Sequence, residues 1–160
     1  SEKTNIIQNL SLIAIQNTKQ MNDFLEFKRK TAWDFYKKNQ HQKAIDYIIT
    51  EIVENKWAQA KDYSALGDIY IETKQYVKAK ESYLKAIQLD TNQLWYQLKY
   101  ANALVFNDEL SEAKEIHKKY KSNNIDVKTS WTQQAKFDID FYKSKGLNVD
   151  DFKKIIRILE

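Results

Sequence analysis

Side chains that could carry out acid–base or metal chemistry are few and scattered in this sequence. It holds two histidines, His41 and His117, and no cysteine, which excludes thiolate metal sites, a histidine-rich metal centre and a cysteine nucleophile. Asp138 and Asp140 are two residues apart, so on a helix their carboxylates point to different sides and do not form a shared acid–base site. The sequence therefore predicts a protein that is not an enzyme and uses no cofactor and no metal.

The glycine and proline content restricts both the fold and the chemistry. Gly67 and Gly146 are the two glycines and lie far apart, so the sequence contains neither a Walker loop nor a dinucleotide-binding fingerprint. Proline is absent, whereas a many-stranded sandwich or barrel uses both residues at its turns. A chain of 160 residues suits one domain with its own core. We expect an all-α fold.

The charge pattern bears on the partner. The net charge of +4 comes almost wholly from lysine, because Arg29 and Arg157 are the only arginines, and arginine is the better residue for bidentate phosphate recognition. The lysine-rich runs 28–30 and 118–121 contain no glycine and only one aromatic residue, Tyr120, which is less than the aromatic interleaving typical of single-strand binding. We therefore expect a protein or peptide partner and no nucleic acid.

The apolar stretches are short. The longest, such as residues 10–15 and 101–106, fall far below the roughly 20 residues needed to span a bilayer, so no membrane span is expected. No signal peptide is visible, although a chain beginning at Ser1 is also compatible with a processed form. The sequence slightly favours the cytoplasm and leaves a periplasmic or secreted mature form open.

Residues 60–93 have the pattern of a helical hairpin. Apolar and small residues recur there at spacings of three and four, which places them on one stripe of each helix: Tyr63, Leu66, Gly67 and Tyr70 in the first helix, and Ala79, Tyr83, Ala86 and Ile87 in the second. Residues 73–76 interrupt the pattern. The small residues Gly67 and Ala79 allow the two helices to approach closely where they cross.

These residues resemble the tetratricopeptide repeat, a helical hairpin with a 34-residue signature. All signature positions but one match in type, and the exception is Thr91, where the family usually has proline. The resemblance implies a right-handed superhelix, a solenoid of antiparallel helical hairpins whose first helices line a concave groove. It also implies a non-catalytic scaffold that binds a peptide or protein segment in that groove.

Steps of 34 residues extend this resemblance on both sides. We expect three to four hairpins within residues 21–145: the best repeat at 60–93, the next at 94–127, and degenerate repeats at 25–59 and 128–145. Residues 1–20 are expected to form an N-terminal capping helix. Gly146 is expected to stop a helix, and residues 146–160 to form a C-terminal capping helix, with one domain overall.

Candidate binding residues lie on the first helix of each hairpin, off the stripe that packs the two helices together. Large apolar residues that packing does not require are the first candidates, since such anchors dominate the binding energy of interfaces. The predicted groove residues are Trp33, Tyr36, Asp68, Trp95, Leu98, Lys99, Asn102 and Phe106. The alternative for each aromatic residue is a place in the core, and for Lys99 and Asn102 ordinary solvation.

Other functions stay open at this point. Some tetratricopeptide proteins bind a C-terminal carboxylate with lysine and asparagine at set positions, but Ser64 and Asp68 occupy two of those positions here, which disfavours that mode. The first alternative is a self-associating assembly element, a homo-oligomer held together by exposed aromatic residues. The second is a small chaperone for a specific client protein.

Overall fold

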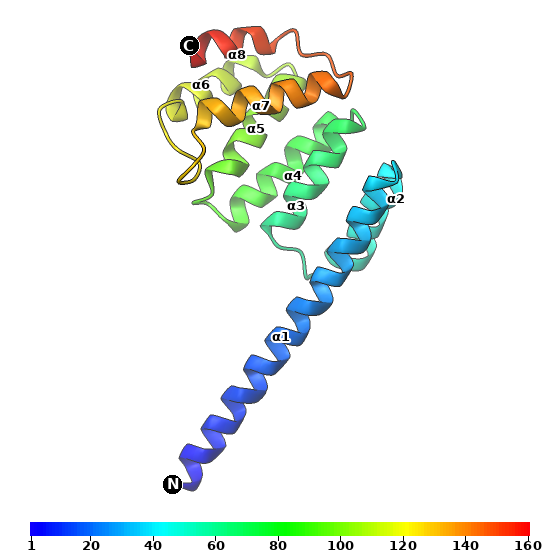
Figure 1. Cartoon of the computed structure of the whole chain (residues 1–160), viewed down its shortest axis with the longest axis vertical. Coiled ribbons are helices and arrows are strands. Elements are labelled where there is room, and N and C mark those ends of the chain that lie inside the picture. Colours follow the sequence, from blue (N-terminus) through cyan, green and yellow to red (C-terminus); the bar gives the residue numbers. More distant parts are fainter. The chain divides into compact units, whose positions relative to one another are not determined.

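The computed structural model describes residues 1–160 and is all-α (Figure 1). It has eight α-helices and one short π-helix. The prediction of an all-α helical repeat is confirmed. The chain divides into two compact units, residues 1–57 and residues 58–160. None of the helices combines the length and the apolar character that crossing a membrane requires.

The first unit is a hairpin with one long arm. It consists of α1 (Glu2–Lys37), α2 (His41–Ile48) and the π-helix η1 (Ile49–Val53). The C-terminal part of α1 packs against α2 and η1, and the side chains buried between them are Leu25, Ala32, Ala44, Ile45, Ile48 and Ile52. An ion pair of 2.7 Å between Lys28 Nζ and Glu51 Oε2 joins α1 to η1.

The N-terminal part of α1 differs from its expected role. Residues 1–20 were predicted to be a separate capping helix, but the helix runs unbroken from Glu2 into the hairpin, and every residue from 1 to 24 is exposed. No glycine or proline interrupts this stretch, so nothing ends the helix before Lys37. All residues from 1 to 20 are exposed, so this part of the helix does not cap its own unit, whereas Phe24 farther along meets the Trp57 ring edge-on at 5.6 Å.

The second unit contains three consecutive helical hairpins. They are α3 (Ala60–Glu72) with α4 (Tyr76–Leu89), α5 (Leu94–Phe106) with α6 (Leu110–Tyr120), and α7 (Trp131–Ser144) with α8 (Phe152–Leu159). Each hairpin packs on the next one, α4 against α5 and α6 against α8. The helix at 152–159 is thus the second helix of a hairpin and also closes the unit.

One turn geometry ends the first helix of every hairpin. Asn39, Lys74, Asp108 and Gly146 all have positive φ angles, of 60°, 60°, 60° and 74°. After each of them, the next N–H donates to a carbonyl five residues back, as in Gln75 N to Tyr70 O at 2.8 Å. This is the Schellman closure of a helix, and it satisfies carbonyls that the helix end leaves free. Gly146 stops its helix as expected.

Close packing inside the best repeat explains its glycine. Tyr83 is buried, and its ring lies so near Gly67 that a Cβ atom at position 67 would overlap the ring. The Tyr83 hydroxyl donates to Asp68 Oδ1, on the residue after this glycine, at 2.6 Å. The packing of α4 on α3 therefore also positions the Asp68 carboxylate.

His117 is a core residue. Its side chain is fully buried, and its Nδ1 accepts a hydrogen bond of 3.1 Å from Trp131 Nε1. Burial lowers the pKa of His117 to about 4. The imidazole is neutral at pH 7, and this hydrogen bond joins α6 to α7.

Candidate functional site: the hollow on α3 and α5

An open hollow of about 390 Å³ lies on the first helices of the second unit. Its lining comes from α3, from the start of α5 and from the segment between α6 and α7: Lys61, Ser64, Ala65, Asp68, Gln93, Trp95, Tyr96, Lys99, Ile125 and Asp126. We call this set the hollow. It lies where the predicted groove faces of the first two repeats of this unit meet.

A charged pair forms part of the wall of the hollow. Lys99 Nζ on α5 lies 2.6 Å from Asp68 Oδ1 on α3, the oxygen that also accepts from Tyr83. Lys99 is held further by two aromatic rings, since its ammonium lies 5.6 Å from the Trp95 ring centre and 5.9 Å from that of Tyr83. The pair is therefore fixed in place before any ligand arrives.

Trp95 provides an aromatic surface in the hollow. It lies in the first turn of α5. Its backbone N–H donates to Gln93 Oε1 at 3.3 Å, so the Gln93 side chain caps the helix. The indole is partly buried and partly open to solvent. It can thus pack against a ligand side chain without a change in the fold.

The segment 121–130 contributes a side of the hollow that sequence reasoning missed. Asp126 folds this segment on itself, because its Oδ1 accepts from the N–H groups of Lys128 and Thr129 at 2.8 Å each. Ile125 N donates to Thr129 O at 2.8 Å. The predicted groove residues all lie on first helices, whereas Ile125 and Asp126 lie at the end of the predicted repeat 94–127, beyond its second helix, so that rule did not include them.

A buried polar cluster joins α5 to α7. Asp138 on α7 accepts from Gln134 Nε2 at 2.8 Å and from Asn102 Nδ2 at 3.4 Å, and Asn102 Nδ2 also lies 3.4 Å from the Tyr142 hydroxyl. Burial raises the pKa of Asp138 to about 6, against the opposing effects of the Lys99 charge and the Gln134 hydrogen bond. Asn102 Oδ1 has no partner.

Three predicted groove residues come together in the hollow. Asp68, Trp95 and Lys99 all line it. Leu98 and Asn102 do not, because they are 1% and 0% exposed within the second unit. The prediction that these two residues face a partner is therefore corrected to a core position. For Asn102 the reason is plain, since α7 covers it with Asp138 and Tyr142.

Phe106 differs from its prediction as well. It stacks on Tyr76 of α4 at 4.7 Å between ring centres and meets Tyr142 and Phe152 edge-on at 5.0 and 5.2 Å. Such an aromatic cluster stabilises packing between helices. Phe106 thus joins α4, α5, α7 and α8 and is only partly open to solvent.

Trp33 and Tyr36 lie together in the first unit. Their rings stack at 4.8 Å between centres, and Tyr36 also meets the His41 ring at 4.9 Å. Trp33 is 55% exposed. The two residues form one aromatic surface on α1, and their part in binding stays a prediction.

Comparison with known proteins supports the repeat. The family model of the tetratricopeptide repeat matches residues 60–93, the best repeat expected from the sequence, so the resemblance is confirmed there. No curated protein and no solved structure matches the chain. Tetratricopeptide repeats are in general non-catalytic and bind other proteins, which agrees with an interaction scaffold.

Proposed function

We propose that this chain, whose residues 60–93 are a tetratricopeptide repeat, binds a short segment of another protein in the hollow on α3 and α5. The observation that carries the proposal is the position of Trp95. Its partly exposed indole lies beside the preformed Asp68–Lys99 pair. An aromatic anchor next to fixed polar groups is the usual composition of an energetically important binding pocket.

The charges of the hollow favour a ligand without a strong net charge. Two basic residues, Lys61 and Lys99, and two acidic residues, Asp68 and Asp126, line it. Because Lys99 is already paired with Asp68, the pair has no net charge with which to attract a terminal carboxylate. We therefore expect a near-neutral internal segment with an apolar side chain placed on Trp95.

The volume limits how much of that segment the hollow takes in. About 390 Å³ lies near the lower end of the range of ligand pockets and accommodates a few side chains. The ligand contact is thus short. We expect a dissociation constant on the order of micromolar for an isolated peptide.

Selection from a random peptide library displayed on phage tests the proposal, followed by calorimetric titration of the selected peptides. Trp95→Ala removes the anchor and should weaken binding by about tenfold or more. Phe137→Ala is the matched control, since Phe137 is an exposed aromatic residue of α7 that does not line the hollow. It should leave the affinity unchanged.

Two results contradict the proposal. One is a wild-type chain that selects no peptide. The other is a set of selected peptides that bind the wild type, Trp95→Ala and Phe137→Ala with equal affinity, which would place the binding surface elsewhere. Circular dichroism of both variants must show unchanged helix content, because Trp95 also contacts the Lys99 side chain.

A further inference from the structure

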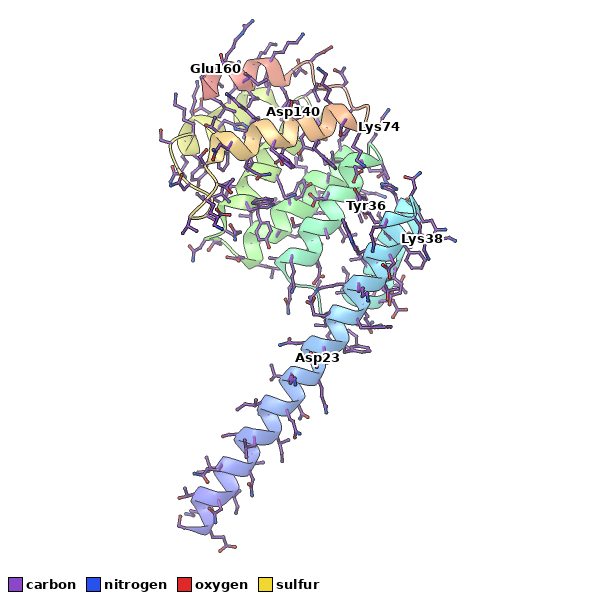
Figure 2. All side chains as sticks on the ribbon, in the orientation of Figure 1. Asp23, Tyr36, Lys38, Lys74, Asp140 and Glu160 are labelled. Atoms are coloured by element: carbon purple, nitrogen blue, oxygen red, sulfur yellow. The ribbon has the colours of Figure 1, made fainter.

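We call the exposed N-terminal part of α1, residues 2–20, the free part of α1. It carries a dense set of apolar side chains that its own unit does not cover. Ile6, Ile7, Leu10, Leu12, Ile13 and Ile15 are between 52% and 67% exposed. Figure 2 shows the side chains of this stretch projecting from the ribbon, up to the labelled Asp23. Large exposed apolar surfaces on soluble proteins mark interaction sites.

The composition of this segment indicates that it is not a helix stable by itself. Residues 5–22 are rich in β-branched and asparagine residues, which have modest helix propensity. Most helical stability in proteins comes from packing of an apolar face and not from propensity. A straight helix here thus requires a partner along its length.

Three of these side chains, Ile6, Leu10 and Ile13, begin a row with the spacing of a coiled-coil seam, whereas Leu12 and Ile15 lie on other sides of the helix. Ile6, Leu10, Ile13, Asn17, Gln20 and Phe24 follow one another at alternating steps of four and three, as the d and a positions of a heptad repeat do. Asn17 takes an a position and Gln20 a d position, so four of the six seam residues are apolar and two carry amides. Phe24, at the end of the seam, also meets the Trp57 ring of its own unit edge-on at 5.6 Å. The side chains at these positions share one face of α1.

Asn17 and the charge pattern select the partner. An amide inside an apolar seam is satisfied by the same amide from an identical helix in register, whereas an apolar partner would leave it unpaired. Residues 4–18 contain no charged side chain, so identical segments meet there without repulsion. Both features fit a second copy of this chain better than a different protein.

We propose that residues 6–24 of α1 associate with the same segment of other copies of this chain as a parallel, in-register coiled coil. Leucine at a (Leu10) with isoleucine at d (Ile6 and Ile13) favours more than two strands. Ile7 and Ala14, at e positions, widen the apolar face, which also favours more than two strands. The inference is independent of the hollow.

Sedimentation analysis of the full chain tests the association. The wild type is expected to form an oligomer of three or four chains, and Leu10→Glu combined with Ile13→Glu to be monomeric. The matched control is Leu12→Glu combined with Ile15→Glu, which changes the same residue types in the same stretch but at outer c and f positions. The control is expected to keep the oligomer.

The orientation is tested by disulfide formation, which is clean because the chain has no cysteine of its own. Ile13→Cys places a thiol in the seam and should cross-link two chains under mild oxidation. Ile15→Cys, on the outer face, should cross-link at least about tenfold more slowly.

Three results overturn the proposal. The first is a wild-type chain that stays monomeric up to about 100 μM. The second is equal loss of association in both double variants, which would indicate nonspecific contact between apolar surfaces. The third is an oligomer in which Ile13→Cys does not cross-link faster than Ile15→Cys, since parallel in-register strands bring the two thiols at position 13 together.

Discussion

Lys99 on α5 and Asp68 on α3 are joined by an ion pair of 2.6 Å, and the Tyr83 hydroxyl donates to the same carboxylate oxygen. Two hairpins thus share one acceptor. The carboxylate belongs to the best-matching repeat, and the ammonium belongs to the next one. The wall of the hollow is therefore also a joint between repeats.

The joint contributes modestly to stability, because the Asp68 side chain is about half exposed. A double-mutant cycle with Asp68→Asn and Lys99→Met should give a coupling free energy of about 1 kcal/mol or less. Urea denaturation measures it, and the coupling should shrink further in about 1 M salt. A coupling of about 3 kcal/mol or more would instead describe a pair shielded from solvent.

Substituting alanine for each of the two glycines should cost different amounts of folding stability. Gly67→Ala should destabilise the second unit by about 2 kcal/mol or more, because the new methyl group overlaps the buried Tyr83 ring. Gly146→Ala should cost about 1 kcal/mol, since space is open there and only the left-handed backbone is strained. Urea midpoints of both variants check the order, and the reverse order would contradict the packing of α3 on α4.

His117 should make the fold sensitive to mild acid. Its pKa of about 4 lies below the ordinary 6.5, so the unfolded chain binds a proton more tightly than the folded chain. Stability from this group is therefore present above pH 6.5 and is lost as pH falls toward 4, by about 2 to 3 kcal/mol. His117→Gln keeps an acceptor for Trp131 and should remove this loss. Unfolding curves at pH 7, 6 and 5 compare the two chains, and parallel pH profiles would contradict a buried neutral imidazole.

Asp138 should make the fold less stable as pH rises, which is opposite to the effect of His117. Its pKa of about 6 lies above the ordinary 3.8, so the folded state holds the proton more tightly than the unfolded chain. The contribution of this protonated carboxyl to the free energy of unfolding is full below pH 3.8 and is lost as pH rises through 6. Asp138→Asn cannot ionise, so its stability relative to the wild type should increase between pH 5 and pH 7. A difference that stays constant over this range would show that Asp138 is hydrated.

The repeat at 60–93 could be predicted because its signature reflects local packing. Gly67, Ala79 and Tyr83 have the types they have because α3 crosses α4 closely, and a spacing of three and four residues shows that directly. The same periodicity placed Asp68, Trp95 and Lys99 on one surface. These residues are positioned by contacts within a hairpin or between neighbouring hairpins.

The sequence pattern could not predict contacts between helices that are farther apart in the chain. Asn102 is buried by α7, which follows the irregular segment 121–130, and the length of that segment moves α7 out of the 34-residue step. Phe106 depends on Phe152 in α8, still farther along the chain. Single-helix periodicity tells which side chains share a face, but not which later helix covers that face.

The continuity of α1 has a mechanical consequence. Once a partner holds its N-terminal part, this helix of 36 residues acts as a lever, and about 40 Å of helical backbone separates Ile6 from Trp33 at 1.5 Å per residue. Whatever holds the tip also sets the direction in which Trp33 and Tyr36 point. Removing seven residues from the free part would shorten the lever by about 10 Å and turn its end by only about 20°, whereas removing two would turn it by about 160°. Rotational phase, and not length alone, would decide which way that aromatic surface faces.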